Sequence, residues 1–268
     1  DYYTTNFVQL NWDQFFALKK IELGKFSIIN VAKELNISKE TTRRKIEELE
    51  KTNIIKKTKK GIVVQPEFYT NTFVKNNEDF RKLICGFISK FSLILEKEKI
   101  IKEKIKTETF EKVTYQNFSY AWKIFFEMMI PTLIDLKTLF NDLETCHVWG
   151  ACTLNQNYEI RKLLKFNNLN IKNKKDFFSI DSKNWSTTGI NAMSISNITG
   201  IPRGTVIRKL KNLIKRKFVN VDNKKLYYPK DFRLKINEVH AFNKPSTLNI
   251  NRLSIFINQL INLANASK

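Results

Sequence analysis

Two stretches of the chain repeat apolar residues at the three- and four-residue spacing of an amphipathic helix. Each stretch opens with a short predicted helix, over residues 28–35 in the first and residues 192–199 in the second. A residue that tolerates left-handed backbone follows, Asn36 in the first stretch and Gly200 in the second. The pattern therefore predicts a short helix and a sharp turn at both places.

A second helix is predicted to begin directly after each turn. Ser38 is a good N-cap for the first, and Pro202 suits the first turn of the other. The buried side of these helices is predicted to carry Thr42, Ile46 and Leu49 in the first stretch and Val206, Leu210 and Leu213 in the second. Residues 54–64 and 218–228 then alternate apolar ends with a basic, turn-rich middle, which predicts a hairpin after each helix.

The two stretches align without a gap when residues 31–68 are laid over residues 195–232. Apolar residues fall on apolar residues, as Ile37 does on Ile201 and Ile54 on Phe218, and Phe68 falls on Phe232 at the end. Because a gapless run of this length is rare by chance, we interpret it as an internal duplication.

The stretch TGIPRGTVIRKLKNLIKRKFV, residues 199–219, closely resembles the winged helix-turn-helix domains of bacterial transcriptional regulators. The first copy matches more loosely, since Asn36 replaces the turn glycine and Thr42 replaces an apolar core residue. The resemblance covers about 38 residues in each copy and implies a helix pair with a hairpin wing that binds DNA. It does not indicate a particular regulator family.

Between the copies, apolar residues at positions 80, 83, 84, 87, 88, 91, 94 and 95 predict an amphipathic helix. Residues 96–112 alternate Lys with Glu and suggest a solvated helix or linker, and residues 115–154 are aromatic and apolar, with Pro131 starting or kinking a helix. We expect the aromatic region to be core; a homodimer interface and an effector pocket remain alternatives. A further helix is predicted near residues 250–264.

The predicted fold is mainly α with small β wings, in which two winged helix-turn-helix domains related by duplication are joined by an apolar helical layer. The expected domains are residues 1–75 (first winged helix-turn-helix), 76–155 (helical scaffold), 156–235 (second winged helix-turn-helix) and 236–268 (a helix packing on the scaffold).

Charge gives the two stretches a candidate partner. The chain of 268 residues has a formal net charge of +21, with nine basic and four acidic residues between positions 39 and 60. Positions 203 to 225 hold nine basic residues against the single acid Asp222. This concentration indicates a polyanion, and double-stranded DNA is the partner that fits the resemblance.

A recognition helix contacts the major groove through the side chains opposite its buried stripe. The residues expected to bind DNA in the first copy are Ser38, Lys39, Thr41, Arg43, Arg44, Lys57, Lys59 and Lys60. Those expected in the second are Arg203, Gly204, Thr205, Ile207, Arg208, Lys211, Lys224 and Lys225. The arginines would donate hydrogen bonds to guanine or phosphate, and Ile207 would contact a thymine methyl group. The wing lysines would contact the DNA backbone.

The sequence offers few residues for metal binding or catalysis. The segment CHVWGAC, residues 146–152, spreads its cysteines about 120° apart on a helix, so we expect no metal site and no cofactor. With two His, no Gly-rich phosphate loop and no Gly-x-Ser-x-Gly elbow, we expect no enzyme. Three scattered Cys, no visible signal peptide and no clean membrane span indicate a cytoplasmic protein. The resemblance to bacterial regulators implies a bacterial protein associated with the nucleoid.

The sequence therefore predicts a sequence-specific DNA-binding transcriptional regulator. A plasmid-type replication initiator with tandem winged helices is one alternative. A protein that uses winged helices for protein contacts or architecture is the other. A homodimer through the apolar helices stays an alternative to a plain core, and no residue pattern supports a particular small-molecule effector.

Overall fold

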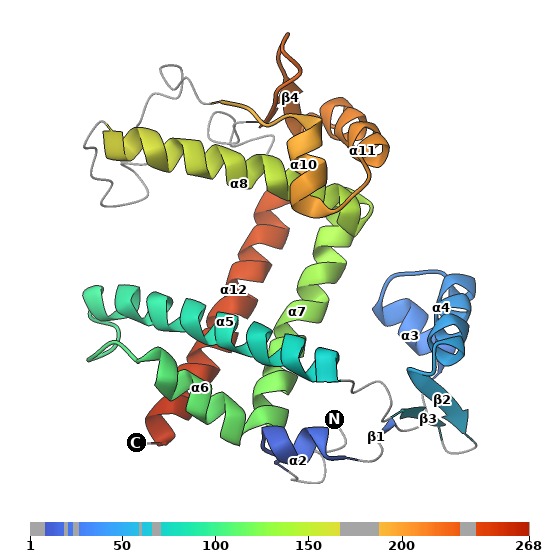
Figure 1. Cartoon of the computed structure of the whole chain (residues 1–268), viewed down its shortest axis with the longest axis vertical. Helices are drawn as coiled ribbons and strands as arrows, with labels where there is room; N and C mark the ends of the chain where they lie inside the picture. Colours follow the sequence, from blue (N-terminus) through green and yellow to red (C-terminus); the bar gives the residue numbers. More distant parts are fainter. Residues whose placement is uncertain are drawn as a thin grey trace. The chain divides into compact units, whose positions relative to one another are not determined.

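The computed structural model describes residues 9–18, 21–23, 27–58, 61–65, 71–166, 188–230 and 240–267, and this part of the chain is mainly helical (Figure 1). The chain divides into two compact units, residues 1–134 with 249–268, and residues 135–248. The boundaries between them fall inside two helices, α7 (Phe118–Phe140) and α12 (His240–Ala266). The division into four domains stays a prediction.

The first repeat stretch, residues 21–65, forms a helix pair beside a small sheet and is called the first segment below. Its elements are β1 (Ile21–Leu23), α3 (Ile28–Glu34), α4 (Lys39–Lys51), β2 (Ile55–Thr58) and β3 (Gly61–Val64). The antiparallel sheet has the order β1-β3-β2, with Ile55 opposite Val64. Its buried cluster is small, consisting of Ile46, Ile55 and Ile62.

One residue of the predicted α4 stripe is not buried. Thr42 and Ile46 are 2% and 8% exposed, but Leu49 is 39% exposed. Among the described residues, the buried cluster of the first segment comes from its own helices and sheet and does not extend to Leu49 in the last turns of α4. The prediction that Leu49 belongs to the core is therefore wrong.

A helical core occupies the rest of the first unit. Its elements are α2 (Trp12–Phe16), α5 (Asn71–Lys97), α6 (Thr107–Gln116), the first part of α7 and the end of α12. Residues from α5, α6, α7 and α12 share one buried cluster, in which Phe110 and Leu260 are at most 1% exposed. Helix α7 runs through Pro131 without a break.

Helix α5 confirms the predicted amphipathic helix, but only part of its predicted apolar set is buried: Ile84, Ile88, Phe91 and Leu95 pack in the cluster of the first unit. Phe80, Leu83, Phe87 and Ile94 are between 37% and 70% exposed. The buried side includes Ser89 and Ser92, which would be expensive to bury without partners. Their hydroxyls bond the backbone of Ile105, Ser89 Oγ donating to its carbonyl at 2.8 Å and Ser92 Oγ accepting from its N–H at 3.0 Å. The apolar pattern alone does not reveal this choice.

The second unit contains the second repeat stretch, residues 190–230, called the second segment below. Its elements are α10 (Ala192–Thr199), α11 (Arg203–Lys215), β4 (Val219–Val221) and β5 (Tyr227–Pro229), and α8 (Leu143–Phe166) packs on both helices. The CHVWGAC residues lie on α8, where Val148, Ala151 and Cys152 enter the same buried cluster as Leu210 and Leu213. Burial raises the pKa of the Cys152 thiol to about 12.

The two segments share backbone features at the same spacing of 164 positions. Asn36 and Gly200 have φ of 50° and 69° in the turn between the helices, and Asn53 and Lys217 have φ of 55° and 61° after the second helix. The hairpins differ, because Ile55 pairs with Val64 whereas Val219 pairs with Pro229, one residue further on. The gapless alignment therefore fails within the hairpin, and its ends at Phe68 and Phe232 lie outside the described residues.

The third strand also differs. In the first segment β1 pairs with β3 over three residues, whereas in the second segment Ile190 forms a single bridge to Tyr227. None of the described helices combines the length and apolar character that a bilayer crossing requires.

Candidate nucleic-acid interface

The turn before α11 is built from local hydrogen bonds and one apolar side chain. Gly200 takes the left-handed conformation that ends α10, and its N–H donates to the carbonyl of Ser196 at 2.8 Å. Ser196 Oγ donates to the carbonyl of Ile201 at 2.7 Å, and the Ile201 side chain is buried. Pro202 then stands at the N-cap, one position before the first helical turn in which the sequence placed it. This turn fixes how α11 leaves α10.

Helix α11 has one buried face and one cationic face. Val206, Leu210 and Leu213 are fully buried. Positions 204, 208, 211 and 215 follow one another at helical spacing on the opposite side, and all four residues are exposed. Arg203 is exposed at the start of the helix, whereas Thr205 and Ile207 are half-buried at the sides. Lys215 therefore extends the exposed line that the sequence ended at Lys211, and helical spacing was the signal that points to it.

The exposed cations of α11 face no acidic residue on their own helix. The helix carries five basic and no acidic residues. Within the described residues, Arg203, Arg208 and Lys211 form no ion pair. Their charges are thus available to a polyanion, for which the favourable interaction comes largely from displaced counterions.

Two basic residues of the second segment serve the protein itself. Lys209 is 8% exposed, and its Nζ lies 2.7 Å from Asp142 Oδ2 and 3.4 Å from Glu144 Oε2. Arg216 donates to the carbonyl of Leu139 and lies over the Phe218 ring, with 4.8 Å from Cζ to the ring centre. The count of nine basic residues thus overstates the charge that the segment presents to a ligand.

The single acid of the second segment shapes the wing. Asp222 Oδ1 accepts hydrogen bonds from the N–H groups of Lys224 and Leu226 at 2.9 and 2.8 Å, and Oδ2 accepts one from the Tyr228 hydroxyl at 3.0 Å. The bond from Leu226 lowers the pKa of Asp222. Lys225 takes a φ of 58° in the resulting turn. Asp222 therefore orders the tip on which Lys224 and Lys225 are exposed.

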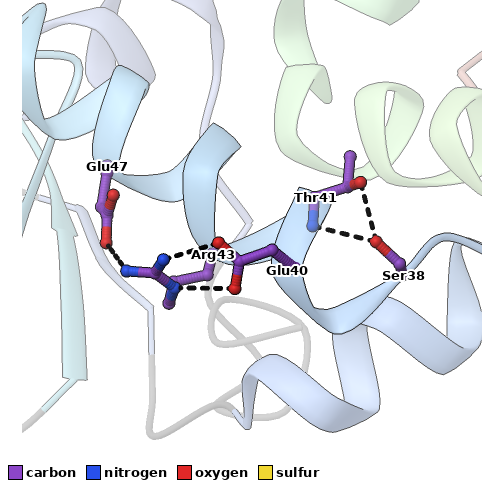
Figure 2. Close-up of polar contacts among 5 residues, drawn as sticks. All are labelled: Ser38, Glu40, Thr41, Arg43 and Glu47. Atoms are coloured by element: carbon purple, nitrogen blue, oxygen red, sulfur yellow. Dashed lines mark hydrogen bonds and ion pairs between the residues drawn. The ribbon is translucent and has the colours of Figure 1, made fainter.

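Helix α4 of the first segment starts with a closed pair of hydroxyls. Ser38 Oγ accepts from the Thr41 N–H at 3.0 Å, and it donates to Thr41 Oγ1 at 2.8 Å (Figure 2). Ser38 is thereby the N-cap that the sequence predicts. Both hydroxyls are partly used within the helix, so a phosphate would have to share them.

Arg43 is held by two carboxylates of its own helix. Figure 2 shows its guanidinium between Glu40 and Glu47, at 2.6 Å from Glu40 Oε1 and 2.8 Å from Glu47 Oε1. The hydrogen bond from Arg43 lowers the pKa of Glu40. Glu47 lies one turn further along α4, and its carboxylate reaches back to accept a hydrogen bond from Arg43. Because all three side chains are well exposed, the network contributes little to stability and mainly restrains Arg43.

The remaining cations of the first segment are divided between paired and unpaired. Lys57 lies 2.9 Å from Glu50 and Lys45 lies 2.7 Å from Glu48. Lys39 and Arg44 are exposed, and neither forms an ion pair within the described ranges. Lys59 and Lys60 fall outside the described residues. Helix α4 carries five basic and four acidic residues, so its surface is nearly neutral where that of α11 is strongly positive.

The comparisons with known proteins address the first segment. Residues 21–67 match the DeoR-like helix-turn-helix domain. The DeoR-like domain covers the three strands and the helix pair, and it supports a DNA-binding transcriptional regulator, a class that usually has no enzymatic activity. No curated protein and no solved structure matches the chain.

Proposed function

We propose that this chain is a sequence-specific transcriptional regulator that reads duplex DNA with two winged helix-turn-helix units, the DeoR-like domain and the second segment. The shared left-handed positions, 164 residues apart, support an origin of the two units by duplication. The DNA contacts would come from the sixteen residues that the sequence analysis selects, with Lys51 and Lys215 added at the ends of the exposed lines. Such a protein would lie with the bacterial nucleoid.

The exposed, acid-free face of α11 is the observation that carries this proposal. A recognition helix must approach the phosphates closely, and uncompensated cations at its surface favour that approach. On α4 the equivalent positions hold Glu40 and Glu47, so we assign the main electrostatic contribution to α11. Two unequal helices would read an asymmetric site.

The test compares one α11 variant and one wing variant with a distant lysine variant in fluorescence-anisotropy titrations on selected genomic DNA. We expect Arg208→Ala to weaken specific binding by about 1–3 kcal/mol and to relax preference at one base position. Lys224→Ala should weaken binding to all DNA sequences alike and should lower the slope of log affinity against log salt concentration by about one. Lys112→Ala removes the same charge from an exposed site on α6 and should change neither the DNA affinity nor its salt dependence. Unchanged affinity in both the Arg208 and Lys224 variants would contradict the proposal.

The two alternatives differ in where the chain binds. A regulator should protect a site near a promoter, whereas a replication initiator should protect repeated sites at an origin and melt A/T-rich DNA. A protein that uses these folds only for protein contacts should bind no duplex at low salt. Footprinting of fragments recovered from genomic DNA separates the three.

We further propose that the exposed stripe of α5 packs against a second copy of the chain. Phe80, Leu83, Phe87 and Ile94 recur at heptad-like spacing on one side of the helix, which is how two helices meet in a coiled coil. Asp79 near one end of the stripe and Lys97 near the other would face each other in an antiparallel pair. Light scattering on Leu83→Glu should show a monomer where the parent chain is a dimer, and Lys82→Glu, on an exposed neighbour, should not.

A further inference from the structure

A short stretch before α10 attaches the second wing to α8. The side-chain amide of Asn155 on α8 donates to the Thr188 carbonyl at 2.8 Å. Two residues later, Ile190 and Tyr227 of β5 exchange backbone hydrogen bonds of 2.9 and 3.1 Å. This single bridge stands where the first segment has a strand paired over three residues, so the second wing has less backbone support.

Between these two attachments, Gly189 lies against two side chains of the wing. A methyl group at Gly189 would stand 2.6 Å from Tyr228 Cζ and 2.9 Å from Leu226 Cβ, closer than two carbon atoms approach without a shift. Glycine therefore lets the chain pass this close to the ring. The contact limits where the Tyr228 ring can lie, and thereby where its hydroxyl can reach.

The Tyr228 hydroxyl connects this contact to the tip of the wing, residues 222–226. It donates to Asp222 Oδ2 at 3.0 Å, while Asp222 Oδ1 accepts from the N–H groups of Lys224 and Leu226. Burial and the hydrogen bond to Asp222 raise the pKa of the Tyr228 hydroxyl, which therefore keeps its proton at neutral pH. The Asp222 side chain thus accepts from the tip with one oxygen and from Tyr228 with the other.

The shape of the tip depends on such side-chain support. Lys225 has a φ of 58°, which is unfavourable for a residue with a side chain. Lys224 and Lys225 are both exposed, so no packing of their own side chains holds the turn. A tip that is not held before binding has to be ordered when it binds, and that ordering lowers the affinity.

We infer that Tyr228 is a positioning residue that preorganises the second wing for DNA, an inference that rests on the proposed function. Tyr228 acts through Asp222, which keeps Lys224 and Lys225 in one arrangement in the free chain. The ordering of the tip then takes place on folding and not on binding. The affinity for DNA therefore depends on a hydroxyl that carries no charge and contacts no phosphate.

Anisotropy titrations of the full chain on a selected DNA site test this role with a matched pair. Tyr228→Phe keeps the ring and should weaken DNA binding about three- to tenfold, the cost of ordering one or two side chains. Tyr227→Phe makes the same change at the next position, where the hydroxyl forms no hydrogen bond within the described residues, and should leave the affinity unchanged.

A double-mutant cycle separates positioning from general support of the fold. The effect of Tyr228→Phe should disappear in a chain that already carries Lys224→Ala and Lys225→Ala, because no cation remains at the tip to be positioned. An undiminished loss of affinity in that chain would overturn the inference, since Tyr228 would then act elsewhere than through the wing.

Hydrogen exchange of the free chain tests the hydrogen-bonded tip without DNA. The Lys224 and Leu226 amides should exchange at least about tenfold faster in Tyr228→Phe than in the parent chain, and Gly189→Ala, which displaces the ring, should have the same effect. Unchanged exchange in Tyr228→Phe would overturn the inference. A parent chain that binds no duplex would refute the proposed function together with this role. Equal DNA affinity with and without the Tyr228 hydroxyl would refute this role alone.

Discussion

The ion pair between α11 and the start of α8 should respond very differently to the loss of its two partners. The Lys209 side chain is 10% exposed, but those of Asp142 and Glu144 are 42% and 57% exposed. Removing Lys209 leaves two carboxylates that water can reach. Removing the Asp142 charge leaves a buried ammonium with only Glu144, 3.4 Å away. The second change should therefore be the costlier one.

The magnitudes follow from this exposure. Breaking a fully buried pair costs about 3–5 kcal/mol, and the surviving contact to Glu144 reduces this to about 2–4 kcal/mol for Asp142→Asn. Asparagine can still accept the Thr145 N–H, which now bonds Asp142 Oδ1 at 2.7 Å, so the start of α8 is preserved. Lys209→Met keeps the apolar stem and should cost about 0–1 kcal/mol.

Hydrogen exchange of the α11 amides, read by mass spectrometry, measures these costs locally. Lys211→Met, on the exposed side of the same helix, is the control and should cost little. Equal destabilisation by Lys209→Met and Asp142→Asn would refute the reasoning. DNA binding separates the two lysine variants. Lys211→Met should lower the slope of log affinity against log salt concentration by about one, whereas Lys209→Met should leave this slope unchanged.

The same pair gives a pH dependence of known sign. Partial burial raises the pKa of Asp142, but the hydrogen bonds from Lys209 and Thr145 outweigh it, so the pKa lies below its usual value of 3.8. A carboxyl whose pKa is lowered by folding stabilises the fold above its unfolded value. The contribution of Asp142 should thus be complete above about pH 5 and be lost as the pH falls through the folded pKa. Asp142→Asn should lack this acid-side loss.

Further substitutions test the candidate interface and the turns that precede its helices. In Gly204→Ala the added methyl group meets no atom within 4 Å, so the variant should stabilise the free chain by about 0.5–1 kcal/mol in thermal melts. It should weaken DNA binding if α11 approaches the groove at this turn. Unchanged affinity would place this turn away from the DNA. Gly200→Ala should destabilise by about 1 kcal/mol in the same melts, because φ is 69° there, whereas Asn36→Gly should not. Glu40→Gln with Glu47→Gln releases Arg43 and should tighten DNA binding and steepen its salt dependence; no change would show that α4 lies off the DNA.

The sequence predicted the helix pairs well because their signals are local. Turn residues such as Gly200 and the apolar spacing of Val206, Leu210 and Leu213 depend on neighbours a few positions away. The burial of Lys209 could be predicted in part, because helical spacing puts it beside Val206 and Leu210. Its partner Asp142 was not, because it comes from a distant part of the chain.

Features that depend on tertiary packing were missed. The buried face of α5 includes Ser89 and Ser92, whose hydroxyls bond the backbone of Ile105, and no periodicity reveals these contacts. The extra residue in the second hairpin was hidden because apolar strand ends allow two registers. The pairing of Arg43 with two glutamates follows from rotamers rather than from spacing alone.

The division of the chain has a consequence for its synthesis. The second unit is inserted in sequence between the parts of the first, because residues 249–268 rejoin residues 1–134. On the ribosome, the cluster around Cys85 and Phe110 therefore waits for Phe256 and Leu260, whereas every residue of the second unit has already emerged. A nascent chain halted before α12 should expose the apolar faces of α5 and α7 that pack on α12 and should recruit chaperones.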